Sequence, residues 1–240
     1  AMASITNAIA LYGPLMPFSA TFFVFSDYLK PAARIAALSG IQQFFVWTHD
    51  SIGVGEDGPT HQPIEHLSQF RALPNFYVWR PADGNENVEA WKTALTMTES
   101  PSAFVCSRQG LALLPAAVFG EASKGGYLLE ESENATITLM ASGSEVETAM
   151  KTKELLASKG VNANVVSVPC FDLLLVQEKA YIDAIIKTER VVAIEAARGL
   201  EWYRFADEII NMDSFGASAP AGQLFEKFGF SAEAIADRIS

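Results

Sequence analysis

The densest group of side chains capable of chemistry lies in a glycine-rich loop, residues 47–63, with the sequence WTHDSIGVGEDGPTHQP. Imidazole suits proton transfer near neutral pH, and glycines let the backbone approach a ligand closely. We therefore predict that His49, Asp57 and His61 belong to a binding or catalytic site. The alternative is that the carboxylates cap turns and the glycines only adopt positive φ. His66 falls inside the helical pattern that follows, and we interpret it as structural or exposed.

Aromatic residues recur at every third position in Phe22, Phe25 and Tyr28, within an apolar segment that we expect to be helical over residues 21–38. On one helix these rings would share a face. Such a stripe usually packs in the core, but it is also a surface on which a flat heteroaromatic ring stacks well. Both interpretations stay open at this point.

Arg108 lies two residues after the end of an apolar, strand-like run, which ends at Cys106. A guanidinium group at the end of a strand suits bidentate contact with phosphate or carboxylate. A structural salt bridge is the alternative. We include Arg108 among the candidate binding residues.

The chain carries no sequence pattern that predicts a metal site. Its two cysteines, Cys106 and Cys170, lack metal-ligand spacing and are expected to be buried free thiols. The segment 82–85 resembles the start of a diphosphate and metal motif, but it lacks the preceding glycine and the later asparagines. We interpret Asp83 as the start of a helix.

Strand-like and helix-like segments alternate along the chain and must position these residues. The patterns predict strands near 43–47, 77–79, 103–106, 136–141, 161–168 and 191–194. They predict helices near 1–11, 21–38, 63–72 and 144–160, and one that runs through Trp91 and Leu95. This alternation favours parallel sheets covered by helices, with ligands at the carboxyl ends of strands. His49 and Arg108 both follow such ends.

Composition excludes several functional classes. Seventeen basic against 28 acidic residues give a net charge of −11, which repels nucleic acid and anionic membranes. The sequence has neither an apolar run of about 18 residues nor the pattern of a signal peptide. We therefore expect a globular protein of the cytoplasm, without a nucleic-acid or membrane partner.

At these residues, and over essentially the whole chain, the sequence resembles the transketolases. The resemblance is carried by residues 48–63, 79–83, 107–109, 141–147 and 215–220. The long loop motif separates this family from the 1-deoxyxylulose-5-phosphate synthases and from the 2-oxo acid dehydrogenase subunits.

The resemblance implies transfer of a two-carbon ketol unit from a ketose phosphate to an aldose phosphate in the pentose phosphate pathway, with thiamine diphosphate and Mg²⁺ as cofactors. Phe25, with Phe22 and Tyr28, is then expected to pack around the aminopyrimidine ring of the cofactor. The core and cofactor interpretations of the stripe become compatible.

The resemblance also assigns the polar candidates. His49 and Arg108 are expected to contact the phosphate of a sugar phosphate, and Asp57 is expected to bind a substrate hydroxyl. His61 is expected beside the reacting carbonyl, as the catalytic residue of this chain.

The implied architecture is two consecutive three-layer α/β domains with mostly parallel sheets, the first lacking its N-terminal strand. We expect a partial pyrimidine-binding domain at residues 1–110, a linker at 111–135 and a C-terminal domain at 136–240. In the family, the diphosphate and magnesium motif and the glutamate that activates the cofactor precede the helix with which this chain opens. We therefore expect no metal ligand here, Mg²⁺ bound mainly by a region absent from this chain, and no activity of the chain alone.

Two kinds of protein partner follow from the resemblance, a second subunit of a homodimer or a complementing N-terminal portion. The rival function is a non-catalytic binding or assembly module that retains a sugar-phosphate pocket.

Overall fold

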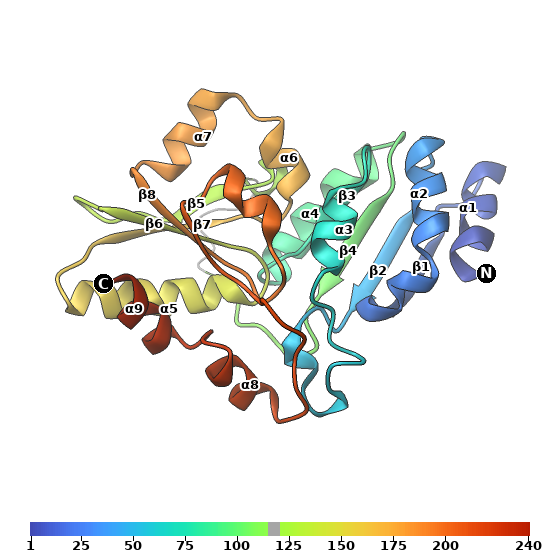
Figure 1. The fold of residues 1–240 in the computed structure, drawn as a ribbon. Coiled ribbons are helices and arrows are strands. Elements are labelled where there is room, and N and C mark those ends of the chain that lie inside the picture. Colours follow the sequence, from blue (N-terminus) through green and yellow to red (C-terminus); the bar gives the residue numbers. More distant parts are fainter. Residues whose placement is uncertain (115–120) are drawn as a thin grey trace.

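Two β-sheets flanked by helices make up the computed structural model, which describes residues 1–114 and 121–240 (Figure 1). The first sheet is parallel throughout, in the order β1-β2-β4-β3: β1 (Phe18–Phe22), β2 (Phe44–Thr48), β3 (Tyr77–Trp79) and β4 (Ser102–Cys106). The second has the order β5-β7-β6-β8-β9, and only its edge strand β5 is antiparallel: β5 (Tyr127–Glu130), β6 (Ile137–Ala141), β7 (Ala163–Ser167), β8 (Arg190–Ile194) and β9 (Glu208–Ile210). The expected α/β fold with mostly parallel sheets is confirmed.

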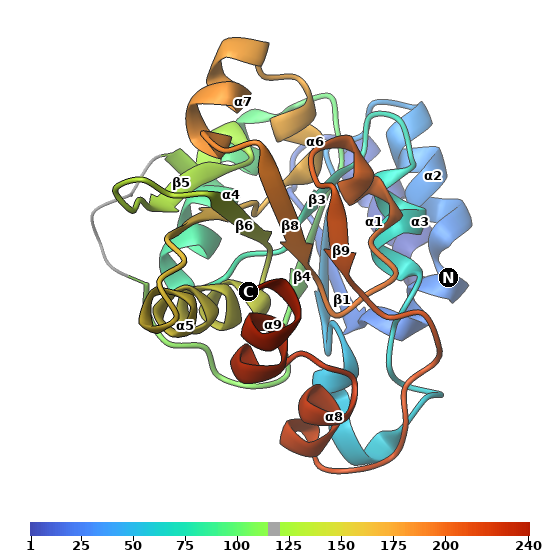
Figure 2. The same cartoon turned by 60° about the vertical axis from the view of Figure 1, so that its left-hand side comes forward.

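Helices lie on both faces of each sheet (Figure 2). Around the first sheet they are α1 (Met2–Tyr12), η1 (Phe23–Tyr28), α2 (Lys30–Leu38), η2 (Ile52–Asp57), α3 (His66–Arg71) and α4 (Gly84–Thr96), where η marks a 3₁₀-helix. Around the second they are η4 (Glu121–Lys124), α5 (Glu145–Ser158), α6 (Phe171–Leu175), α7 (Lys179–Ile186), η5 (Leu200–Arg204), α8 (Ala221–Lys227) and α9 (Ala232–Ile239). Within the described residues, none of these helices combines the length and apolar character that crossing a membrane requires.

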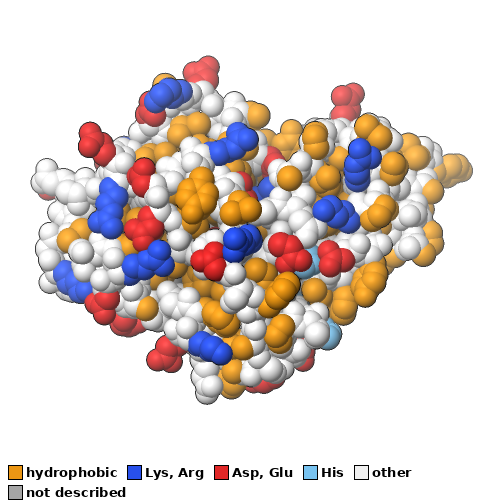
Figure 3. Space-filling view, viewed as in Figure 1, with side chains coloured by type: hydrophobic (Ala, Val, Ile, Leu, Met, Phe, Trp, Pro, Cys, Tyr) orange, Lys and Arg blue, Asp and Glu red, His pale blue; other side chains and the backbone are white. Residues whose placement is uncertain are grey.

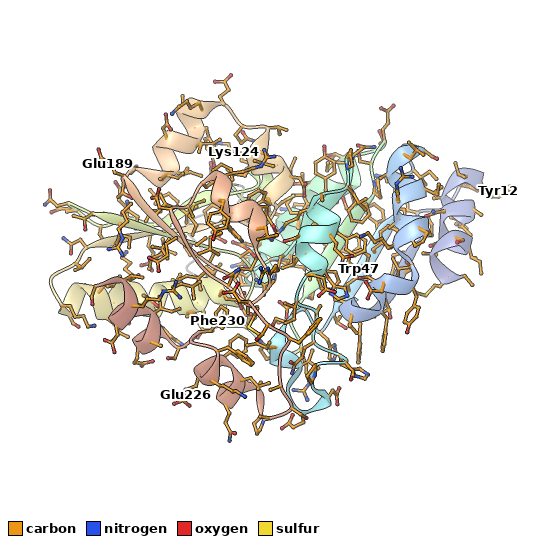
Figure 4. All side chains as sticks on the ribbon, viewed as in Figure 1. Tyr12, Trp47, Lys124, Glu189, Glu226 and Phe230 are labelled. Carbon is orange, nitrogen blue, oxygen red and sulfur yellow. The ribbon has the colours of Figure 1, made fainter. Side chains whose placement is uncertain are left out.

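The core of the first sheet follows the two-residue alternation of strand side chains. Phe45 and Trp47 of β2 face η1 and α3, where they join Phe23 and Phe70 in one buried cluster (Figure 4). Phe44 points to the opposite face, toward α4. This sandwich fixes β2, and with it the loop that follows β2.

The second sheet alternates in the same way. Leu139 of β6 packs with Leu156 of α5 and Ile235 of α9. Met140 faces the other side, where it packs with Phe171 of α6. Both faces are apolar, as expected for parallel strands covered by helices.

One predicted element was wrong. The expected helix over residues 21–38 consists of the end of strand β1, the 3₁₀-helix η1 and the shorter helix α2. β1 forms because its five residues pair in register with all of β2, from Phe18 opposite Phe44 to Phe22 opposite Thr48. Sheet pairing thus overrides the helical spacing of the apolar residues.

The expected linker, residues 111–135, contains regular structure. β5 lies within it and adds an antiparallel edge to the second sheet. Residues 115–120 of that linker lie outside the described part of the chain.

Hydrophobic side chains gather over the end of the molecule formed by α1 and α2 (Figure 3). The most exposed large ones there are Ile5, Leu11, Tyr12 and Leu38. Phe18 of the edge strand β1 is also exposed. Contiguous exposed apolar surface of more than a few hundred Å² is typical of interaction sites in general.

Candidate active site

The carboxyl ends of the first sheet bring the candidate residues to one edge. Because all four strands are parallel, their ends meet on the same side. The register places Phe22, at the end of β1, opposite Thr48 of β2, and Thr48 opposite Cys106 of β4. η1, the loop after β2 and the segment holding Arg108 therefore leave the sheet next to one another.

The aromatic stripe of Phe22, Phe25 and Tyr28 forms a wall along the end of β1 and the 3₁₀-helix η1. A 3₁₀-helix has three residues per turn, so every third side chain lies in one line. Ring centroids are 6.1 Å apart between Phe22 and Phe25 and 6.2 Å apart between Phe25 and Tyr28. Phe25 is 36% and Tyr28 85% exposed, so these two rings are not core residues. Phe23 points the other way and is the buried aromatic residue of this helix.

A pocket of about 340 Å³ lies against this wall. Phe25, Tyr28 and Thr21 line one side of it, and Ala1 and Met2 of the opening helix line another. Its flat aromatic side and largely apolar lining fit a heteroaromatic ring such as an aminopyrimidine. Phe22 does not line this pocket and contacts His49 instead.

Both loop histidines contact the aromatic wall. The imidazole of His49 stacks on Phe22 with centroids 3.7 Å apart and an interplanar angle of 19°. His61 meets Phe25 edge-on, with centroids 5.6 Å apart and an angle of 79°. The structure thus joins the aromatic stripe and the two histidines, which the sequence left as separate features.

His49 has both a lowered imidazole pKa and an uncommon backbone conformation. Burial lowers the pKa of its imidazole, and the charge of Arg108 lowers it further, against the opposing carboxylates of Asp57 and Asp50. Its backbone has φ 65°, which is uncommon for a residue other than glycine. A largely neutral imidazole beside a guanidinium group can take up a proton when an anion arrives.

The remaining polar candidates face solvent. Asp57 and Arg108 are exposed, and neither has an ion-pair partner in the part of the chain that the structure describes. His61 is half-buried, and its Nδ1 lies 2.9 Å from the hydroxyl of Thr60. Unpaired polar groups at the ends of strands are available to a ligand.

The loop holds its shape through local capping. Ser51 precedes η2, and its hydroxyl accepts a hydrogen bond from the amide of Gly53 at 3.3 Å. Gly55 and Gly58 have φ of 83° and 78°, so η2 can bend and end there. A Cβ on Gly53 would lie 2.7 Å from Oε1 of Gln109, so the loop contacts the segment after β4 closely.

Three further residues have structural roles. His66 is buried, with Nε2 3.3 Å from Asp27 and its ring against Phe23, which agrees with the structural interpretation. Asp83 accepts a hydrogen bond from the amide of Glu86 at 2.8 Å and begins α4, as predicted. Asp50 is not a turn cap but a buried ion-pair partner of Arg80.

The acidic, histidine and cysteine side chains of the described residues form no metal centre, and the two thiols are unreactive. Among residues 1–114 and 121–240, no group of three or more His, Cys, Asp or Glu side chains could hold a metal ion. Both cysteines are free, with Cys170 buried and Cys106 half-buried. Burial raises the pKa of both thiols, that of Cys106 to about 11, so neither is a reactive thiolate near neutral pH.

Sequence reasoning missed Arg80, whose side chain is fully buried. The signal was its position directly after strand β3, which is similar to the position of Arg108 two residues after β4. One arginine is buried against carboxylates and the other is exposed, and local sequence does not distinguish them.

Comparisons with known proteins agree with this geometry. A model described as "Transketolase, pyrimidine binding domain" matches residues 1–112, and one described as "Transketolase-like TK C-terminal domain" matches residues 125–231. A transketolase of Halalkalibacterium halodurans is 45% identical over 247 residues, covering 99% of this chain and 37% of that protein.

The solved structures that this chain resembles are also transketolases. The transketolase of Campylobacter jejuni has a TM-score of 0.96 and 54% identity, over 99% of this chain and 37% of that one. A transketolase of Pichia stipitis, solved as a complex with sedoheptulose-7-phosphate, has a TM-score of 0.95 and 39% identity, over 99% of this chain and 35% of that one. The chain thus spans little more than a third of its relatives, and across both matched domains it belongs to the transketolase family.

Proposed function

We propose that this chain supplies the pyrimidine-ring and substrate side of a thiamine diphosphate-dependent site for ketol transfer between sugar phosphates. The supporting observation is that the aromatic wall of Phe22, Phe25 and Tyr28 contacts His49 and His61 at the edge where Arg108 emerges. A site for ring stacking and a site for an anion then lie side by side. Thiamine diphosphate, when bound, supplies the carbanion chemistry of carbon–carbon bond cleavage.

The chain's own residues orient the substrate and move protons. Phe25 and Tyr28 hold the aminopyrimidine ring, while Phe22 supports His49. His49 and Arg108 bind the phosphate of the sugar. Asp57 binds a hydroxyl of the donor, and His61 exchanges a proton at the reacting carbonyl.

The site is completed by residues outside this chain. We propose that Mg²⁺ and the diphosphate are held elsewhere, because the described residues offer no cluster of metal ligands. The apolar surface of α1, α2 and β1 then contacts the complementing portion, as a second subunit or an N-terminal chain. We place the limits of the two domains at residues 110 and 136 and the protein in the cytoplasm, in keeping with its two free cysteines.

Ketol transfer by the purified chain tests this proposal. The assay contains thiamine diphosphate, Mg²⁺, a ketose phosphate and an aldose phosphate, with and without an N-terminal portion of a related transketolase. We expect no turnover by the chain alone and turnover with the added portion. Turnover by the chain alone would contradict the proposed half-site. Sugar-phosphate binding without turnover in either assay would favour the non-catalytic module.

A further inference from the structure

Arg80 connects the candidate site to the second sheet. Its side chain is fully buried, and its Nε and Nη2 donate to Oδ2 of Asp50 at 3.1 and 2.7 Å. Its Nη1 donates to the backbone oxygen of Ser142 at 2.8 Å, to the hydroxyl of Ser142 at 3.1 Å and to Glu145 at 2.5 Å. Asp50 directly follows His49, so this guanidinium group ties the start of the site loop to α5 and β6.

The turn after β6 is shaped around Arg80. Gly143 has φ 57° and donates its amide to the backbone oxygen of Arg80 at 3.0 Å. A Cβ on Gly143 would lie 2.8 Å from Cζ of Arg80, so any side chain there would displace the guanidinium group. Residues 141–147, which showed no chemistry of their own in the sequence, thus form the binding surface for this arginine.

The segment 215–220 holds the other end of the loop. Nε2 of Gln62 donates to the backbone oxygens of Gly55 and Ala217, both at 2.9 Å. The hydroxyl of Ser218 donates to the backbone oxygen of Glu56. α8, which follows this segment, lies against η2, and the two are neighbours in both ribbon views (Figures 1 and 2).

We propose that the second sheet positions His49 for phosphate binding through the chain of contacts Glu145–Arg80–Asp50. Arg80 and Glu145 are positioning residues and touch no substrate. The inference rests on the proposed role of His49. A non-glycine residue persists at φ 65° only when its surroundings fix it, and the two hydrogen bonds that Oδ2 of the neighbouring Asp50 accepts from a buried arginine do so. The second sheet thereby takes part in the site without contributing a catalytic group.

The test compares Glu145→Gln with Glu86→Gln in the purified chain. Both carboxylates are buried and both link the two sheets, since Glu86 accepts from Tyr127 at 2.7 Å and also from Ser167. Of these two carboxylates, Glu145 contacts Arg80, and Glu86 forms no ion pair or hydrogen bond with it among the described residues. The readouts are the imidazole NMR signals of His49 and the affinity for ribose 5-phosphate.

We expect Glu145→Gln to shift the His49 signals and to weaken ribose 5-phosphate binding about tenfold, because a displaced His49 loses part of its charge-assisted contact with the phosphate. Glu86→Gln should lower stability and leave both readouts unchanged. If the two variants behave alike, the positioning role is wrong. Ser142→Ala, which removes one hydroxyl contact with Arg80, gives a milder version of the same comparison if Glu145→Gln fails to fold.

The outcomes also separate this inference from the proposed function. If His49 signals shift in Glu145→Gln while the wild-type chain binds no ribose 5-phosphate, the positioning contacts are upheld and the phosphate role of His49 is contradicted. If the wild-type chain binds ribose 5-phosphate and both the His49 signals and the affinity are unchanged in Glu145→Gln, the positioning role is contradicted while the proposed sugar-phosphate site is upheld.

Discussion

Two polar clusters lie side by side in this molecule and differ in how their charges are satisfied. The buried cluster contains Asp50, Arg71, Arg80, Glu145 and Glu195, and the site cluster contains His49, Asp57, His61 and Arg108. In the buried cluster every side chain has an ion-pair partner within the chain. In the site cluster, Arg108 and Asp57 are exposed and unpaired among the described residues.

The pKa values show the same contrast. Burial opposes ionisation of Glu195, yet the guanidinium group of Arg71, followed by that of Arg80, lowers its pKa to about 2. For Glu145 burial prevails over Arg80 and raises the pKa. His49 has a lowered pKa because burial and a nearby cation both disfavour its charge. Paired charges thus support the structure, while an imidazole kept neutral beside a free cation is suited to bind an anion.

The largest expected difference between the clusters concerns stability. Arg80→Met leaves Asp50 and Glu145 buried without their partner, which should destabilise the chain by about 3–5 kcal/mol. Arg108→Met, at an exposed position, should change the free energy of unfolding by no more than about 0.5 kcal/mol. Urea unfolding of both variants measures this. Similar midpoints for the two would remove the distinction between the clusters.

An intermediate effect is expected on ligand binding. Arg108→Gln loses a charge-assisted contact with phosphate, so the affinity for ribose 5-phosphate should fall by about tenfold or more. Arg34→Gln is the matched control, because Arg34 is also exposed but lies on α2, away from the strand ends. Isothermal titration of the three proteins measures the affinities. An equal loss in both variants would indicate a general charge effect.

The smallest effect concerns pH. A bound phosphate favours the imidazolium form and raises the lowered pKa of His49, so binding takes up a proton. The contribution of His49 to affinity is therefore largest below the lowered pKa of the free chain. It falls as the pH rises from that pKa to the higher pKa of the complex. The ratio of wild-type to His49→Gln affinity cancels the ligand's own titration, and it should decrease about threefold between pH 5.5 and 8. A constant ratio would mean that His49 does not bind the phosphate as a cation.

The sequence was a good guide where one local pattern decided the structure. Runs such as Phe44–Thr48 became strands because alternating side chains found apolar partners on both faces. β1 was missed because its identity depends on pairing with β2, which lies beyond the reach of local spacing. β5 was missed for the same reason, since a four-residue edge strand is defined by its neighbour β7.

The candidate site was predictable as a set of residue types but not as an arrangement. The density of histidine and glycine in residues 47–63 indicated a functional loop. The stacking of His49 on Phe22 and the contact of His61 with Phe25 require the sheet to bring distant segments together. Arg80 and Arg108 have the same local context, and only burial assigns them to different clusters.

The hydrogen bonds of Gln62 and Ser218 have a consequence for recombining relatives of this protein. A chimera joined between the two sheets would combine a loop from one parent with a segment 215–220 from another. The close fit of Gly216 against Gln62 leaves no space for a larger residue there. We therefore expect that a successful exchange carries residues 47–63 and Arg80 together with the second half of the chain.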